Sequence, residues 1–80
     1  MTNKEEFIDF LNFLMEDEEI SKKIRAKIND LISLSDKEDL GIFLDKSTNI
    51  FEDILENPDI PMYTRTQLWE GLSLIESVQL

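Results

Sequence analysis

The feature that most constrains this chain is internal repetition: shifted by 40 residues, it aligns with itself without a gap. Arg25 falls on Arg65, and most other matches are residue types common in protein cores. They include Leu14 with Ile54, Met15 with Leu55, Ile20 with Ile60, Ile28 with Leu68 and Ile32 with Leu72. A period of about 40 residues is typical of paired-helix units too small to bury an apolar face alone. The sequence therefore predicts one domain over 1–80 with two related units, 7–40 and 47–80.

The first unit reads as helix, acidic turn, helix. Its apolar residues recur every three or four positions, which is the period of one face of a helix. They are Phe7, Ile8, Leu11, Leu14 and Met15, followed by Ile24, Ile28, Leu31 and Ile32. The acidic run 16–19 ends the first stripe, and Ser21 is a suitable N-cap for the second helix.

The second unit repeats this order, with polar residues 47–49 predicted to interrupt its first helix. Its stripes are Leu40, Phe43, Leu44, Phe51, Ile54 and Leu55, then Leu68, Leu72 and Ile75, with Thr64 and Gly71 beside the last three. Pro58 lies in the turn, and Pro61 suits the first turn of the last helix.

These patterns predict an all-α fold, because no segment alternates or carries a β-branched run as a strand would. Turns this short make neighbouring helices antiparallel. Two arrangements of the hairpins remain open. They form either a four-helix bundle or a HEAT-like stack of two repeats.

Composition restricts the chemistry available to the chain. Among its 80 residues there is no Cys and no His, and the net charge is -10. The usual acid–base group, thiolate ligands and disulfides are therefore absent, and we expect no enzyme activity, cofactor or metal site. The acidic charge repels nucleic acid phosphates, so direct nucleic acid binding is not expected. The chain start lacks a signal-peptide pattern and no window resembles a membrane span, so we expect a cytoplasmic protein without membrane contact.

A family resemblance is carried by the second turn and the helix that follows it. Residues 56–69, ENPDIPMYTRTQLW, together with SLIE at 73–76, resemble a small archaeal family of uncharacterised all-helical proteins. Segment 14–32 resembles that family's first unit, although Ser21 stands where the family usually has Pro. The resemblance implies a helical-hairpin fold and an archaeal source, and it implies no activity. The acidic turn, Ile, and Arg five residues later are also distantly similar to HEAT-type repeats.

Arg25 and Arg65 lie near the apolar centres of their helices, where a charge needs a partner. Glu16 and Glu56, or the carbonyls of the preceding turns, are the available partners. We interpret both arginines as structural clamps that fix each turn to its helix, with an anion site as the alternative. The acidic run 16–19 lacks the ligand spacing of a calcium loop, and favours a helix start instead.

The candidate interface consists of apolar residues off the core stripes, Phe13, Met62 and Trp69. They either pack against the other hairpin or form an exposed patch for a partner or second copy, since such residue types are favoured at interfaces. The main hypothesis is a non-enzymatic protein-interaction or scaffold module. The alternatives are an acidic partner of a basic ribosomal or nucleic-acid-associated protein and, less favoured, a metal-dependent enzyme.

Overall fold

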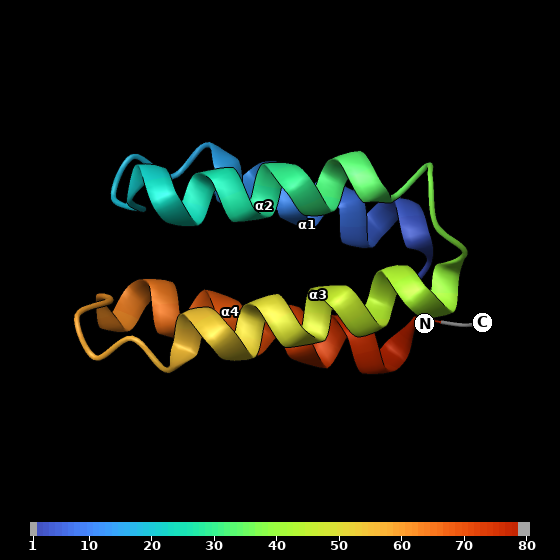
Figure 1. Ribbon diagram of the computed structural model, residues 1–80. Helices are drawn as coiled ribbons and strands as arrows, with labels where there is room; N and C mark the ends of the chain where they lie inside the picture. The colour runs from blue at the N-terminus through green and yellow to red at the C-terminus, as the bar shows by residue number, and fades with distance from the viewer. Residues whose placement is uncertain (1, 79–80) are drawn as a thin grey trace.

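The structure, a computed structural model, describes residues 2–78 and contains four α-helices (Figure 1). They are α1 Lys4–Met15, α2 Lys22–Leu34, α3 Leu40–Leu55 and α4 Met62–Ser77. The predicted all-α fold is confirmed. The first three helices begin at capping residues whose side chains accept a hydrogen bond from the backbone N–H three residues on: Asn3, Ser21 and Asp39. Helix α4 instead follows Pro61, which supplies no side-chain cap and lies just before the helix rather than in its first turn.

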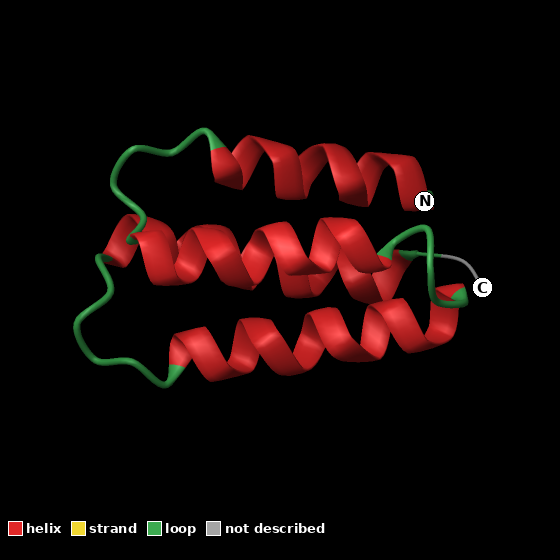
Figure 2. Cartoon of the chain, turned by 45° about the horizontal axis from the view of Figure 1, so that its top comes forward, coloured by secondary structure: helices red, strands yellow, loops and turns green. Residues whose placement is uncertain are grey.

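The four helices pack as a closed ring, which decides between the two predicted arrangements. Each hairpin forms one layer, α1 with α2 and α3 with α4, and the layers join through α2 against α3 and α1 against α4 (Figures 1 and 2). In a solenoid stack the equivalent helices of successive units would lie side by side. Here α1 and α3 lie diagonally across the core, as in an up-down-up-down bundle.

The two ends of the described chain close one end of the bundle. The backbone N–H of Thr2 donates to the carbonyl of Ser77 at 3.3 Å, and Thr2 also forms an isolated parallel bridge with Val78. The Ser77 hydroxyl contacts the Thr2 hydroxyl and the Leu74 carbonyl. These bonds hold the start of α1 beside the end of α4, so the seam between these helices is fixed at that end.

Burial follows the 40-residue offset along most of the chain. The buried positions 7, 11, 14, 20, 24, 28 and 31 correspond to buried Ser47, Phe51, Ile54, Ile60, Thr64, Leu68 and Gly71. The residues at paired positions often differ in size, with Phe7 matched by Ser47 and Leu31 by Gly71. Large residues in one half can therefore face small ones in the other.

The centre of the core shows this complementarity directly. The Phe7 ring of α1 lies 5.8 Å from Phe43 and 6.2 Å from Phe51, measured between ring centroids. Residues four apart share one face of a helix, so Ser47 lies between these two rings on α3. All four side chains are fully buried. The small Ser47 side chain leaves room for Phe7 to reach across from the diagonal helix.

The predicted interruption of the third helix at 47–49 is wrong, because α3 runs unbroken from Leu40–Leu55. The Ser47 hydroxyl donates to the Phe43 carbonyl at 2.9 Å, and the Thr48 hydroxyl to the Leu44 carbonyl at 3.0 Å. Hydroxyls that bond the preceding turn are satisfied inside a helix. Polar composition therefore does not end this helix.

Candidate functional site

An open hollow of about 390 Å³ lies at the seam between α1 and α4. Phe13, from the last turn of α1, and Tyr63, from the first turn of α4, both line it. These side chains are 52% and 50% exposed. Glu16, Asp17 and Glu18, from the turn after α1, form the rest of its wall. The hollow thus combines two half-exposed aromatic rings with three consecutive acidic residues.

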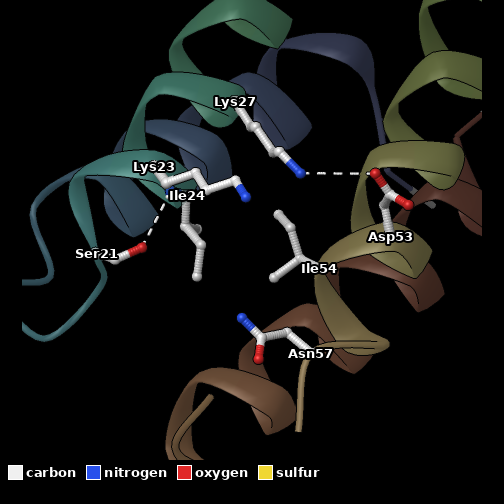
Figure 3. Close-up of a pocket in the computed structure, with 7 residues that line it drawn as sticks. All are labelled: Ser21, Lys23, Ile24, Lys27, Asp53, Ile54 and Asn57. Carbon is white, nitrogen blue, oxygen red and sulfur yellow. Dashed lines mark hydrogen bonds and ion pairs between the residues drawn. The ribbon is translucent and has the colours of Figure 1, made fainter. Parts of the chain in front are cut away.

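The opposite seam, between α2 and α3, provides an internal comparison (Figure 3). At the 40-residue offset, Phe13 corresponds to Asp53 and Tyr63 to Lys23. Both of these charged residues line a hollow at that seam, where Lys27 Nζ lies 3.6 Å from an Asp53 carboxylate oxygen. The fold therefore accommodates ordinary charged residues at these two positions. The aromatic pair is a property of the α1/α4 seam alone.

The acids at 16–18 that line the aromatic hollow form no ion pair among the described residues, although the Arg25 guanidinium bonds the Asp17 backbone. Within residues 2–78 the ion pairs are Lys27 with Asp53 and Lys46 with Glu38, so none involves the acids at 16–18. The last turn of α1 contains no basic residue, and the C-terminal end of a helix carries partial negative charge. Yet no group of three or more acidic side chains in the described part of the chain is placed to hold a metal ion.

The two predicted clamps bond to backbone carbonyls. Arg25 Nη2 donates to the Asp17 carbonyl at 2.8 Å, while Arg65 donates through Nη1 to Leu55 at 3.0 Å and through Nη2 to Asn57 at 3.2 Å. Carbonyls at the end of a helix lack partners within the helix, so a guanidinium that reaches back can satisfy them. Each arginine thereby ties a turn to the helix that follows it.

The acidic partners proposed for these arginines are not found. Glu16 and Glu56 are exposed C-cap residues, and no ion pair among the described residues joins either of them to Arg25 or Arg65. Residues next to them, Asp17, Leu55 and Asn57, instead supply the carbonyls.

Replacing Arg65 with alanine is expected to lower the free energy of unfolding by about 1–3 kcal/mol, because two carbonyls lose a charged donor. Arg65→Lys should lose nearly as much, since an ammonium does not reproduce the two-pronged geometry. Urea denaturation followed by circular dichroism measures both variants. Unfolding curves that coincide with that of the unchanged protein would contradict the clamp role.

Met62 and Trp69 are exposed, at 68% and 50%, but the structure does not place them in the hollow with Phe13. At about 100° per residue they share one flank of α4, and Tyr63 lies about 120° from Trp69. Of the predicted interface residues, only Phe13 belongs to this site. Sequence reasoning did not include Tyr63 in the candidate interface, because helical periodicity shows only that it lies on the side of α4 opposite the core stripe. The alignment of the two halves could have identified it, because Tyr63 is aromatic where the first half has the charged Lys23.

A second hollow, of about 290 Å³, opens between the two turns. It includes Thr64, which is 2% exposed and whose Oγ1 has no hydrogen-bond partner in the described residues. Two helix N-termini border this hollow, a feature that attracts anions. The carboxylates of Glu19 and Asp59 also line it and oppose such binding. This hollow is therefore a weaker candidate site than the aromatic one.

These features define a class: small all-helical bundle proteins with an acidic surface and one aromatic seam. No helix in residues 2–78 combines the length and apolar content needed to cross a bilayer. Residues 2–78 match the sequence model of the "Uncharacterised protein family (UPF0147)". The chain belongs to this family, and the resemblance to a small archaeal family of uncharacterised helical proteins is confirmed.

Similar proteins come from several archaea. The chain is 29% identical over 73 residues to a UPF0147 protein of Methanosarcina acetivorans, covering 89% of this chain and 75% of that protein. It is 31% identical over 74 residues to one of Methanothermobacter thermautotrophicus, covering 89% and 72%. It is 31% identical over 68 residues to one of Thermococcus kodakarensis, covering 82% of each. No solved structure matches this chain.

Proposed function

We propose that this protein is a non-enzymatic interaction module that binds another protein, or a second copy of itself, through the aromatic hollow. The observation that carries the proposal is the exposure of Phe13 and Tyr63 at positions where the other half of the chain has Asp53 and Lys23. Exposed aromatic residues are enriched at binding surfaces and supply much of their energy. A folding role alone would not require two half-exposed rings here.

The other seam supports this proposal by showing what the bundle tolerates. Lys23 and Asp53 occupy the equivalent positions, and all four helices still contribute buried residues to the shared core. Aromatic side chains left half in water cost free energy that charged ones do not. The presence of two half-exposed aromatic rings, Phe13 and Tyr63, at one seam is consistent with a partner that covers them.

A second candidate is an acidic partner of a basic protein, such as a ribosomal or nucleic-acid-associated one. It is favoured by the net charge of -10 and by the acidic wall of the hollow. Binding dominated by charge should weaken sharply as salt is added, whereas binding dominated by apolar contact should not. A salt titration of the complex separates the two candidates.

The test compares two double variants that both keep the net charge at its original value. Phe13→Ser with Tyr63→Ser removes the aromatic pair, and Lys23→Ser with Asp53→Ser alters the equivalent positions of the other seam. Each is used for affinity capture from archaeal cell extract with mass spectrometry, and for sedimentation equilibrium of the purified chain. We expect capture or self-association to be lost only in the aromatic variant. A monomeric chain whose captured proteins are the same for all three forms would contradict the proposal.

A further inference from the structure

The α1/α4 seam lacks the cation that the other seam supplies for itself. At the α2/α3 seam, Lys27 pairs with Asp53, and Lys23 lines the same hollow (Figure 3). The corresponding residues of α4 are Tyr63 and Gln67, which carry no positive charge. The acids at 16–18 nevertheless line the hollow here. The one basic residue of α4, Arg65, bonds the turn at 55–57 instead. Among the described residues, no side chain of the second hairpin forms an ion pair with the acids at 16–18.

The aromatic rings favour a particular kind of cation. Phe13 and Tyr63 come from two different helices and border the same hollow, so a side chain that enters it meets ring surface from both. Lysine and arginine combine an apolar stem, which packs against such rings, with a charged end attracted to aromatic faces. A small hydrated ion would gain nothing from the rings.

We infer that the hollow receives a lysine or arginine side chain from a basic segment of a partner protein, with its stem against Phe13 and Tyr63 and its charge toward the acids at 16–18. This inference rests on the interaction function proposed above and names the chemistry of the partner. Charge complementarity identifies the occupant, since a second copy of this chain also carries a net charge of -10 and is repelled.

The backbone of the turn that carries the acidic wall is held in place before any partner arrives. Arg25 fixes the Asp17 carbonyl at 2.8 Å, and the Asp17 carboxylate accepts the backbone N–H of Glu19 at 2.9 Å. Backbone that is already ordered loses less entropy when a ligand binds. The arginine predicted as a structural clamp thus also positions the binding wall.

The experiment titrates the full ¹⁵N-labelled chain with a short peptide in which lysine alternates with glycine, and with its arginine counterpart. The expected amide shift changes concentrate at residues 13–18 and at Tyr63. A peptide whose lysines are acetylated, and therefore neutral, should not bind. In the Phe13→Ser, Tyr63→Ser variant the dissociation constant should rise about tenfold. In the Lys23→Ser, Asp53→Ser variant it should change less than about twofold, because surface positions away from the site contribute little.

A second pair of variants introduces the missing cation. Tyr63→Lys reproduces the residue of the opposite seam and should weaken peptide binding about tenfold or more, by removing a ring and neutralising the wall. Thr66→Lys adds the same charge at an exposed position of α4 outside the hollow and serves as the control. A melting curve of each variant verifies that the bundle is folded.

Shift changes spread evenly over the acidic surface, with equal affinities for the aromatic and control variants, would overturn the inference. The two proposals fail separately. Suppose that capture of a cell protein depends on Phe13 and Tyr63 but is not reduced by excess basic peptide. This result would support the interaction module and refute the basic segment as its ligand. Capture that never depends on these two residues would refute the module itself.

Discussion

Replacing Phe7 with alanine is expected to lower the free energy of unfolding by about 3–5 kcal/mol, since the loss of a buried aromatic ring leaves a cavity. Phe7 is fully buried and contacts Phe43 and Phe51 across the bundle diagonal. A domain of this size has only about 5–15 kcal/mol in total, so much of the stability should be lost. Urea and thermal denaturation followed by circular dichroism measure the change.

Phe13→Ala is the matched control, because it removes the same side chain from the same helix. Phe13 is 52% exposed, so we expect a change within about 0.5 kcal/mol. A Phe7 variant no less stable than the Phe13 variant would contradict the packing described for the bundle centre. Adding Ser47→Leu to Phe7→Ala should recover part of the loss, since Ser47 lies between the rings that Phe7 contacts.

Gly71→Ala is expected to destabilise the bundle by about 1–3 kcal/mol, although alanine is the better helix former by about 1 kcal/mol. A Cβ atom on Gly71 would lie 2.4 Å from the Phe51 ring and 2.8 Å from the Phe10 ring. Phe51 is fully buried within the core cluster, so its ring can move only by displacing other core side chains. The steric cost therefore exceeds the gain in helix propensity, and the midpoint of thermal unfolding should fall.

Gly41→Ala tests the same substitution where space is available. A Cβ atom there would meet only an Asp39 carboxylate oxygen at 3.5 Å, an ordinary contact. We expect a gain in stability of up to about 1 kcal/mol, because alanine is the better helix former and its Cβ has room here. Two glycine-to-alanine changes of opposite sign would show that packing, not propensity, governs position 71. Equal stabilisation at both sites would refute the close approach of α4 to Phe51.

Much of the fold was predictable because helical periodicity is a local property. The stripe containing Phe7, Leu11 and Leu14 identifies the inward face of α1 before any neighbour is known, and Ser21 identifies the start of α2. The error at 47–49 has a local cause too. Serine and threonine in a sequence suggest the end of a helix. The structure shows that the hydroxyls of Ser47 and Thr48 instead bond carbonyls of the preceding turn.

The candidate site was only partly predictable. Phe13 was identified because it lies off the core stripe, and its exposure agrees with that reasoning. Its neighbour in the hollow, Tyr63, could not be paired with it, because sequence spacing within α4 does not reveal which flank faces α1. For the same reason Met62 and Trp69 were grouped with Phe13, although they occupy another flank of α4.

The sequence by itself determined the helices, their inward faces, the matched residues of the two halves and the absence of histidine and cysteine chemistry. Only the tertiary structure decided that the hairpins close into a ring, that Phe7 fits over Ser47, and that Phe13 and Tyr63 share an acidic hollow. The physical reason is range. Periodicity and capping act within a few residues of chain. Packing instead joins side chains such as Phe13 and Tyr63, far apart in the sequence, which meet only when the bundle closes.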